Sequence, residues 1–321
     1  MTKIFITRDI PDAGLKMLKK HKSIKLSIYQ KDKKIPRKEL LTHVKGVDII
    51  LSILTDKIDA QVMDAAGPQL KMIANYAVGF NNIDIEAAKK RGIIVTNAPG
   101  PEITESVAEH AVAFIFGLAH RILETDKFNR AGKYTGWGPK LLLGTDVTGK
   151  TLGIIGTGNI GNALARRLHD GFDIKILYND IKRSPNLEKK YGAKFRTKDQ
   201  LLKESDFVSL HVPLLPGTVH LIGARELKMM KKTAFLINTS RGPVVDEAAL
   251  TKALTNGEIA GAGLDVYENE PKINKTLLKL QNTILTPHTA SATVETRQAM
   301  SRTAATNILA FLSNKQIPNK I

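Results

Sequence analysis

Residues 152–161 read Leu-Gly-Ile-Ile-Gly-Thr-Gly-Asn-Ile-Gly, and the rest of the chain can be interpreted outward from them. The stretch begins with four mainly apolar residues, typical of a buried strand, and continues with Gly156, Gly158 and Gly161 in the pattern Gly-x-Gly-x-x-Gly. Over 159–170 apolar residues recur at intervals of three or four, which predicts a helix with one buried face. A strand, a tight turn and a helix in this order favour a dinucleotide site over a purely structural glycine turn.

The glycines and the start of the helix suit a bound dinucleotide. Gly156 permits the turn, Gly158 lets a pyrophosphate approach the backbone, and Gly161 lets the helix pack close to the strand. The helix N-terminus adds unpaired N–H groups and a partial positive charge. We therefore expect the cofactor to bind at these three glycines and at Asn159 and Ile160.

Asp180 stands where this motif requires an acid. It follows a second predicted strand at 174–178 and lies nineteen residues after Gly161. An acid there accepts hydrogen bonds from the adenosine ribose and repels a 2′-phosphate, which favours NAD(H). Lys182 and Arg183 follow closely and leave NADP(H) open.

A second nucleotide motif overlaps the first. Residues 144–151 have the spacing of a P-loop, which would indicate an ATPase or kinase. A P-loop must open a helix, whereas Lys150 and Thr151 lead into the predicted strand. We therefore interpret 148–150 as the turn before that strand.

Composition limits the chemistry. A length of 321 residues allows two domains, and the absence of cysteine excludes disulfides and cysteine-ligated metals. The eight histidines show no metal-ligand spacing, so we expect no metal. The N-terminus does not resemble a signal peptide, and the longest uncharged apolar run, 111–119, is too short for a bilayer. We expect a cytoplasmic protein with no membrane partner.

A net charge of +17 raises the question of nucleic-acid binding. The basic residues are spread thinly, and aromatic residues, which could stack on bases, make up only 5% of the chain. We therefore expect no specific nucleic-acid partner. Solvated helix faces, steering of anionic substrates and non-specific binding of polyanions stay open as explanations of the charge.

Strands and helices alternate along the chain. In the first hundred residues the predicted strands are 4–7, 24–29, 47–53, 72–74 and 93–96, and the predicted helices are 12–20, 37–45, 59–66 and 84–91. From residue 151 on, six strands are predicted at 152–155, 174–178, 206–211, 234–238, 261–265 and 283–286. This alternation predicts an α/β fold with two doubly wound parallel-sheet domains.

The turn-forming residues Asn97-Ala-Pro-Gly-Pro101 mark the predicted boundary between the domains. A helical pattern then runs over 102–130, so we expect one long helix that connects the domains. A final helix is predicted over 290–314, with no strand after it.

Arg241, Glu270 and His288 each follow the end of a predicted strand closely. In open α/β sheets, ligands bind outside the carboxyl ends of the strands. A histidine beside a carboxylate can give a proton to a carbonyl that accepts hydride, and an arginine can hold a carboxylate by two prongs. Each residue alone could be an ordinary loop residue, but together they predict catalysis on a 2-oxo acid.

Five segments resemble the D-isomer-specific 2-hydroxyacid dehydrogenase family and together span nearly the whole chain. They are 75–84 (Asn-Tyr-Ala-Val-Gly-Phe-Asn-Asn-Ile-Asp), 152–161, 238–247 (Asn-Thr-Ser-Arg-Gly-Pro-Val-Val-Asp-Glu), 263–271 (Gly-Leu-Asp-Val-Tyr-Glu-Asn-Glu-Pro) and 286–293 (Thr-Pro-His-Thr-Ala-Ser-Ala-Thr). Within that family, 51–56 and the region from Trp137 to 146 are similar to the glyoxylate/hydroxypyruvate reductase branch.

The resemblance implies roles for matching residues. Arg241 would bind the substrate carbonyl and carboxylate, His288 would be the acid/base, and Glu270 would pair with His288. Backbone N–H groups of Val78 and Gly79 would also hold the substrate carboxylate. The cofactor would contact Arg241 and His288, together with Thr104, His211, Val212, Pro213, Thr239 and Asp265.

The resemblance also implies an architecture and an activity. A flavodoxin-like substrate domain would comprise 1–98 and 290–321, and a Rossmann domain would comprise 99–289, with the substrate in the cleft between them. The activity would be NAD(P)-dependent reduction of glyoxylate or hydroxypyruvate by a homodimer, with Trp137 reaching the neighbouring subunit's pocket or packed within its own domain. Oxidation of 3-phosphoglycerate, D-lactate or phosphite, and a non-catalytic NAD(H) sensor, stay open as alternatives.

Overall fold

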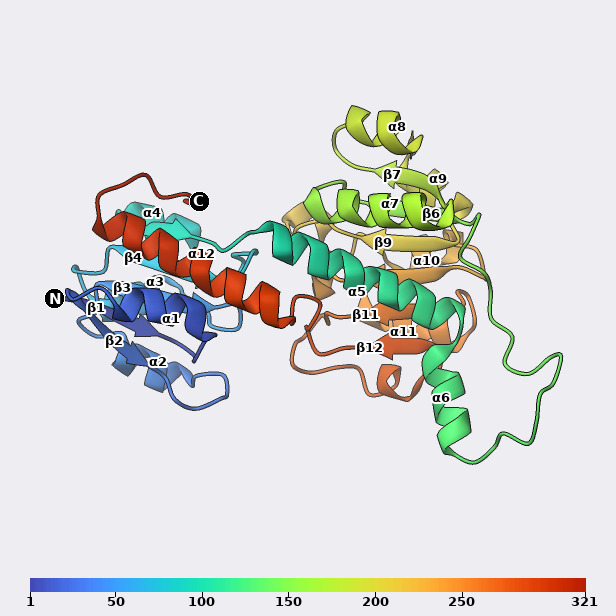
Figure 1. The fold of residues 1–321 in the computed structure, drawn as a ribbon, viewed down its shortest axis with the longest axis horizontal. Helices are drawn as coiled ribbons and strands as arrows, with labels where there is room; N and C mark the ends of the chain where they lie inside the picture. Colours follow the sequence, from blue (N-terminus) through green and yellow to red (C-terminus); the bar gives the residue numbers. More distant parts are fainter. The chain divides into compact units, whose positions relative to one another are not determined.

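The computed structural model describes all residues from Met1 to Ile321. The chain forms two compact units, each built on one parallel sheet (Figure 1). Unit 1 comprises Met1–Ile103 and Ala292–Ile321, and unit 2 comprises Thr104–Ser291. Both sheets are parallel throughout and carry helices on both faces, so the predicted fold class is confirmed.

Unit 1 has a five-stranded sheet in the order β2-β1-β3-β4-β5, which is the flavodoxin-like arrangement. Its elements are β1 (Thr2–Ile6), α1 (Asp12–Lys19), β2 (Ile24–Ile28), α2 (Arg37–His43), β3 (Ile49–Ile53), α3 (Ala60–Ala66), β4 (Met72–Tyr76), α4 (Ile85–Lys90), β5 (Ile94–Thr96) and α12 (Val294–Leu312).

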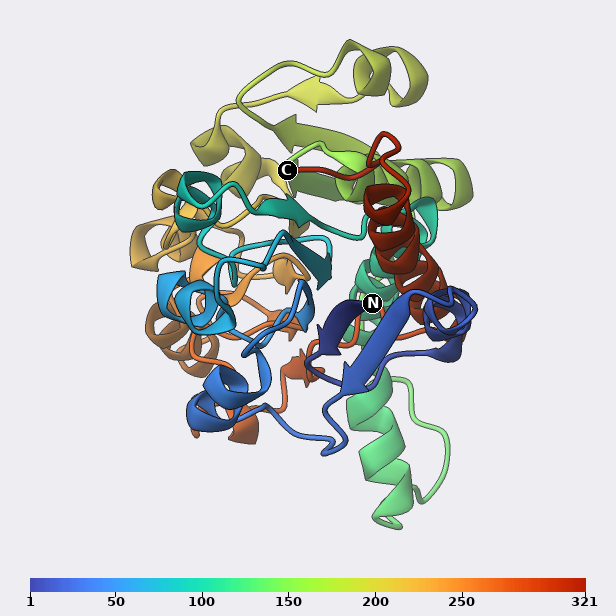
Figure 2. The same cartoon turned by 90° about the vertical axis from the view of Figure 1, so that its left-hand side faces the viewer.

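The two faces of this sheet are covered by different helices (Figure 2). Because side chains alternate along a strand, Ile50 and Ile73 face a core shared with α2, α3 and α4. Their neighbours Ile49 and Met72 are fully buried on the opposite face, where α1 and α12 lie side by side. Strands buried on both faces explain the nearly continuous Ile and Val runs of the sequence.

The close packing of α12 on α1 requires a glycine. Gly14 N donates a hydrogen bond of 3.0 Å to Ser301 Oγ, and the same hydroxyl donates to Pro11 O over 2.6 Å. A Cβ atom at Gly14 would lie 2.1 Å from Ser301 O, so no larger residue fits. This contact fixes the last helix of the chain to the first helix of unit 1.

Unit 2 has a seven-stranded sheet in the order β12-β11-β10-β9-β6-β7-β8, with the Rossmann topology. Its elements are α5 (Pro101–Ala119, which begins in unit 1), α6 (Ile122–Arg130), β6 (Thr151–Ile155), α7 (Asn159–Phe172), β7 (Lys175–Asn179), α8 (Pro185–Tyr191), β8 (Lys194–Phe195), α9 (Lys198–Glu204), β9 (Phe207–Leu210), α10 (Ala224–Met229), β10 (Phe235–Asn238), α11 (Glu247–Thr255), β11 (Gly261–Leu264) and β12 (Thr283–Leu285), with short 3-10 turns at Pro216–Thr218, Gly242–Val244 and Leu277–Lys279.

The prediction of six strands in this unit is wrong by one. β8 pairs in parallel with β7, with Leu177 opposite Lys194 and Tyr178 opposite Phe195. A strand of two residues, one of them charged, has no periodicity that sequence can reveal. The seventh strand extends the sheet at the β7 edge.

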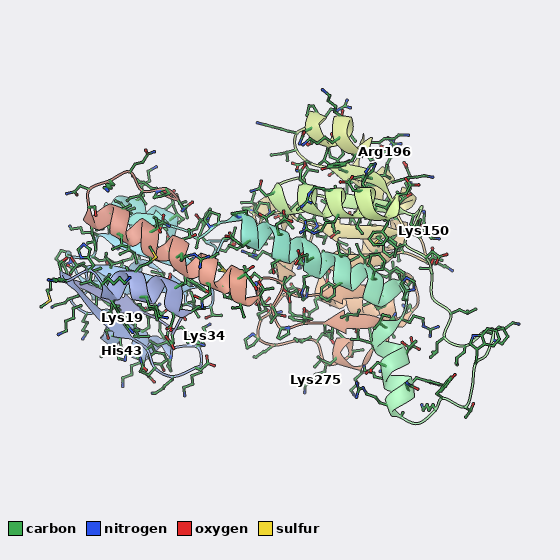
Figure 3. The ribbon with its side chains drawn as sticks, in the orientation of Figure 1. Lys19, Lys34, His43, Lys150, Arg196 and Lys275 are labelled. Carbon is green, nitrogen blue, oxygen red and sulfur yellow. The ribbon has the colours of Figure 1, made fainter.

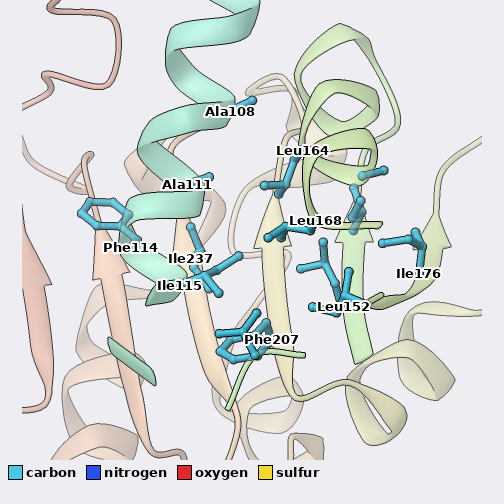
Figure 4. Packing of buried hydrophobic residues seen from close by; sticks show 14 of the residues in the cluster. Ala108, Ala111, Phe114, Ile115, Leu152, Leu164, Leu168, Ile176, Phe207 and Ile237 are labelled. Atoms are coloured by element: carbon cyan, nitrogen blue, oxygen red, sulfur yellow. The ribbon is translucent and has the colours of Figure 1, made fainter. Parts of the chain in front are cut away.

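Two separate apolar layers cover the sheet of unit 2. One layer joins α5, α7 and α8 to the strands: Leu164 and Leu168 of α7 lie near Leu152 of β6, whereas Phe114 of α5 lies farther across the sheet, against β11 (Figure 4). The other joins α9, α10 and α11 to the opposite face. The predicted buried face of the helix after the glycines is therefore confirmed.

The prediction of one continuous helix over 102–130 is wrong. α5 ends at Ala119, α6 begins at Ile122, and the two helices are bent by 59°. Arg121 adopts a left-handed conformation (φ 54°), and its side chain pairs with Glu124 at 2.7 Å. No single helix is long and apolar enough to cross a membrane. The bent pair of α5 and α6 together has the length and composition of a membrane span, but α5 is packed in the core of unit 2.

Residues 131–150 form a long segment without helix or strand, and Trp137 within it is 84% exposed. Trp137 is therefore not packed within its own unit, and that alternative is wrong. Basic side chains are distributed over many elements of both units, among them Lys19, Lys34, Lys150 and Lys275 (Figure 3).

Candidate active site

The glycine turn after β6 has the geometry that only glycine permits. Gly156 has φ +93°, and a Cβ there would lie 2.6 Å from His211 O. A Cβ at Gly161 would lie 2.3 Å from Gly156 O, so α7 could not approach the turn as closely. These two glycines are required by the fold itself, before any ligand binds.

Gly158 differs from the other two glycines because a Cβ there would meet nothing within 4 Å. Gly158 is the N-cap of α7, and its carbonyl accepts the first helical hydrogen bond, from Asn162 N at 3.0 Å. The N–H groups of Asn159, Ile160 and Gly161 therefore have no partner within the helix. Open space beside free donors fits the pyrophosphate of a dinucleotide.

Asp180 lies at the end of β7 and is tied to the glycine turn. Its Oδ2 accepts hydrogen bonds from Thr157 N (2.6 Å) and Thr157 Oγ1 (2.8 Å), and its Oδ1 accepts one from Ile181 N (2.7 Å). Burial alone would raise the pKa of Asp180, but these hydrogen bonds outweigh burial and lower it. The side chain is thus a carboxylate at neutral pH.

The two cations after Asp180 differ in their surroundings. Arg183 Nε donates to Glu188 Oε1 at 3.0 Å, and its guanidinium lies 5.9 Å from the centre of the Phe195 ring. Arg183 is therefore directed to α8 and β8. Lys182 is exposed and makes no ion pair.

β6 and β9 are neighbours at the point where the strand order of the Rossmann sheet reverses, which is where such sheets bind ligands. His211 follows β9, and its Nε2 lies 2.8 Å from Ser209 Oγ. Desolvation lowers the pKa of His211 to about 4, so the ring is neutral at pH 7. Val212 and Pro213, which come next, are at least partly exposed.

β10 places Thr239 and Arg241 at the same edge of the sheet. Thr239 is buried, and its Oγ1 makes no hydrogen bond. Asn238 shapes the turn, because its Oδ1 accepts from Ser240 N and Oγ while its Nδ2 donates to Arg241 O. Burial lowers the pKa of Arg241 and the charge of Glu270 opposes this shift; arginine nevertheless stays a cation in proteins.

Glu270 and His288 form the predicted pair, with 3.0 Å between Glu270 Oε2 and His288 Nδ1. The other oxygen, Oε1, accepts from Tyr267 N at 3.0 Å. Burial alone would raise the pKa of Glu270, but the hydrogen bond and charge of His288 lower it. With Nδ1 engaged, Nε2 is the nitrogen that can give or take a proton.

The backbone of His288 has φ 58°, in the left-handed region that is unusual for a residue with a side chain. Its N–H donates to Asp265 O at 2.8 Å. The surrounding loop holds this conformation in place, as is common where a side chain must be aimed.

Asp265 fixes that loop with both carboxylate oxygens. Oδ1 accepts from Thr286 Oγ1 (2.6 Å) and Thr289 N (2.7 Å), and Oδ2 accepts from Ala290 N (2.8 Å). The residue is 1% exposed, so its carboxylate serves the loop that carries His288. Thr104, which like Asp265 is expected to contact the cofactor, lies in the first turn of α5.

Val78 and Gly79 lie in unit 1, in the loop after β4. Asn75 Nδ2 donates to Gly79 O and to Asn82 Oδ1, and Asn82 Nδ2 donates to Ile53 O, so two amide side chains shape this loop. The carbonyl of Val78 accepts a hydrogen bond, but the N–H groups of Val78 and Gly79 donate none within unit 1.

Sequence reasoning missed the supporting side chains of the site. Thr157 holds Asp180, and Ser106 and His110 of α5 contact the loop of His288. Ser106 and His110 lie among the apolar residues of α5 that are buried, such as Val107 and Ala111, where nothing in the local pattern distinguishes a supporting residue from a core residue. No cluster of three or more His, Asp or Glu side chains is arranged to hold a metal ion.

Residues 112–290 match the family model for the NAD-binding domain of D-isomer specific 2-hydroxyacid dehydrogenases. A glyoxylate reductase from Thermococcus litoralis is 50% identical over 99% of this chain and 96% of its own length. A solved structure of a protein from Thermus thermophilus is 39% identical, with a TM-score of 0.93 over the full length of both chains. The NADPH-dependent glyoxylate/hydroxypyruvate reductase of Sinorhizobium meliloti is 32% identical, with a TM-score of 0.86 over 100% of this chain and 98% of its own.

The match to the Thermococcus litoralis relative extends over both units of the chain. The chain therefore belongs to the D-isomer-specific 2-hydroxyacid dehydrogenase family, in its glyoxylate reductase branch, and it reduces a 2-oxo acid with a nicotinamide cofactor.

Proposed function

We propose that this protein reduces glyoxylate to the corresponding 2-hydroxy acid, using NADH in preference to NADPH. The observation that carries the proposal is the 3.0 Å pair of His288 Nδ1 and Glu270 Oε2 at the same sheet edge as Arg241. An imidazole paired with a carboxylate and a partly desolvated guanidinium are the groups that carbonyl reduction of a small anionic acid needs.

Arg241 binds the substrate in this proposal. Its guanidinium donates to the carboxylate and to the carbonyl oxygen, which polarises the carbonyl as negative charge develops on that oxygen. Since burial already removes water from Arg241, these hydrogen bonds are stronger than on an open surface. The free N–H groups of Val78 and Gly79 stay our prediction for a second contact with the substrate carboxylate.

His288 supplies the proton. A reduced nicotinamide, when bound, supplies the hydride to the carbonyl carbon. His288 gives the proton on Nε2 to the oxygen of the former carbonyl, while Nδ1 stays hydrogen-bonded to Glu270. Glu270 holds the ring in one orientation, because its Oε2 is hydrogen-bonded to Nδ1.

The preference for NADH rests on Asp180. The ionised carboxylate would repel a 2′-phosphate by about 3 kcal/mol at 5 Å and an effective dielectric of 20. Arg183 is engaged by Glu188 and is not free to offset this repulsion, which leaves Lys182 as the nearby cation. NADPH dependence in the Sinorhizobium meliloti relative makes the comparison worth measuring in this chain.

A homodimer is also part of the proposal. Apolar side chains in and after α6 are exposed, namely Ile122, Leu123, Tyr134, Trp137, Leu141 and Leu143. Leu123 and Leu143 also line a cavity of about 490 Å³, together with charged side chains such as Arg121 and Lys232. Large apolar side chains that are exposed in one segment of the chain are typical of a protein interface. A monomeric mass by sedimentation at micromolar concentration would exclude the dimer.

The test is a panel of 2-oxo acids with NADH and with NADPH, followed by the loss of reduced-cofactor absorbance. We expect the highest kcat/KM with glyoxylate, lower values with hydroxypyruvate and pyruvate, and no oxidation of D-lactate, 3-phosphoglycerate or phosphite at a comparable rate. A higher kcat/KM with any other acid would replace glyoxylate as the substrate. Tight NADH binding without turnover of any acid would favour the sensor alternative.

A further inference from the structure

Helix α5 contacts both ends of the loop 286–290, which carries His288. Ser106 Oγ donates to Ala290 O at 2.8 Å, and His110 Nε2 lies 3.0 Å from Thr286 Oγ1. The two α5 residues are four positions apart, so they lie one above the other on a single face of the helix. One helix face therefore supports the whole loop.

The direction of the hydrogen bonds follows from the donors available. Thr286 Oγ1 donates its single proton to Asp265 Oδ1, 2.6 Å away, and can only accept from His110. His110 Nε2 must then carry hydrogen, and 3.8 Å separates it from the same Asp265 oxygen. Burial lowers the pKa of His110, which keeps the ring neutral with one donor nitrogen.

α5 is itself fixed to the strand that leads into Asp265. Phe114, one turn after His110, packs edge-on against the imidazole with 4.6 Å between ring centres. A Cβ at Gly263 of β11 would lie 2.7 Å from the Phe114 ring, so helix and strand are in closest approach there. The position of His110 relative to Asp265 is thus set by backbone packing.

We propose that Ser106 and His110 are positioning residues, which hold the loop 286–290 so that His288 keeps the strained conformation in which it can transfer a proton. This inference rests on the proposed function, because it assigns these two residues to the acid/base step. Asp265 restrains the loop from the strand side, through Thr286, Thr289 and Ala290, and the α5 pair restrains it from the helix side.

The experiment compares His110→Leu, which removes the donor, with His110→Gln, whose amide can donate from nearly the same place. The matched control is His169→Leu on α7, because the His169 ring contacts Asp170 at 3.0 Å and Tyr191, with 5.3 Å between ring centres, and makes no contact with the loop 286–290. The first readout is amide hydrogen exchange of 286–290, which needs no activity. We expect exchange to become about tenfold faster in His110→Leu only, equivalent to about 1.4 kcal/mol of local opening.

The second readout is kinetic. His110→Leu should lower kcat with glyoxylate about tenfold or more, as loss of a supporting contact commonly does. The KM for NADH should stay the same, and the isotope effect with NADH deuterated at the transferred position should rise, because the chemical step becomes slower. A loss of folded protein alone would lower kcat without changing the isotope effect. His110→Gln should restore most of the rate.

Ser106→Ala provides a milder variant should His110→Leu fold poorly, with about threefold effects expected in both readouts. The inference would be overturned if the amides of 286–290 exchanged at the wild-type rate in both His110→Leu and Ser106→Ala. So would faster exchange with an unchanged kcat and isotope effect, since the loop would then be supported without consequence for catalysis. Failure of the proposed function would be recognised separately, as absence of turnover in the wild-type protein.

Discussion

The two loops that follow β6 and β12 lie at the same edge of one sheet but differ in their backbone N–H groups, which are free in the first loop and hydrogen-bonded in the second. After β6, Gly156 and Gly161 bring the backbone into close contact, and the first N–H groups of α7 are left without partners. After β12, a histidine occupies a left-handed conformation, and Asp265 satisfies the neighbouring donors. A loop that binds a ligand through its backbone keeps donors free, whereas a loop that presents one side chain must have its donors occupied.

The largest expected effect is the loss of activity when the histidine of the loop after β12 is replaced. His288→Ala should lower kcat on glyoxylate by about 100 to 10,000-fold, because general acid catalysis contributes that much, while the Kd for NADH stays within about twofold. Arg241→Lys should be nearly as harmful, since a point charge cannot reproduce a two-pronged contact. Near-normal rates in both variants, with NADH binding measured by fluorescence titration as the control, would disprove the active-site assignment.

The next largest effect distinguishes two glycines of the turn after β6, one needed for NADH binding and the other for stability. Gly158→Ala meets no protein atom, so we expect an unfolding free energy within about 0.5 kcal/mol of the wild type and an NADH Kd raised about 100-fold. Gly156→Ala should instead destabilise the fold by about 3 kcal/mol, because it combines φ +93° with a contact of 2.6 Å to His211 O. Denaturant titration and NADH titration of both variants measure the contrast. Equal stability of the two would contradict it.

The pH dependence of stability should report on His211, whose carbonyl lies against Gly156 of the glycine turn. The pKa of His211 is about 4 in the folded protein, against an ordinary value of 6.5, so between these values the unfolded chain binds a proton that the folded chain does not. The free energy of unfolding is therefore highest above pH 6.5 and decreases as the pH falls through 4, by on the order of 3 kcal/mol in all. His211→Gln should flatten this part of the pH–stability curve. An unchanged curve would mean that other groups control acid unfolding.

Replacing Asp180 tests whether the region of the glycine turn also determines the preference for NADH over NADPH. We expect the kcat/KM for NADH to exceed that for NADPH about tenfold or more, equivalent to about 1.4 kcal/mol, and Asp180→Ser to narrow the ratio mainly by improving use of NADPH. Thr157→Val is the matched control, because it removes one hydrogen bond to Asp180 and leaves the charge. A wild-type preference for NADPH would show that Lys182 outweighs Asp180.

The contrast between the loops also explains what sequence could predict. The glycine turn was predictable because its determinants lie within ten residues: an apolar strand, three glycines and an amphipathic helix. The fold class followed from repeated alternation of such units. The residues that hold His288 were not predictable, because His110 and its partner Thr286 are 176 positions apart in the chain.

Two errors of the prediction have physical causes that the sequence does not reveal. The break between α5 and α6 depends on a left-handed Arg121, and arginine carries no signal for that conformation. β8 is recognisable only by its pairing with β7. Arg241, Glu270 and His288 are predicted as site residues because each follows a strand, but the 3.0 Å distance between His288 Nδ1 and Glu270 Oε2 depends on the tertiary structure.

The smallest expected effect measures the cost of holding His288 in its unusual conformation. Both His288→Gly and His288→Ala remove the imidazole and its contact with Glu270, so they differ only in whether the residue at φ 58° carries a Cβ. Glycine adopts this region freely, whereas a left-handed alanine costs about 1 to 2 kcal/mol. Because glycine also gains entropy in the unfolded chain, we expect His288→Gly to be more stable than His288→Ala by about 0.5 to 1 kcal/mol in denaturant titrations, with both variants inactive. Equal stability of the two variants would show that the loop relaxes once the ring is gone, and that Asp265 and α5 do not impose the strain.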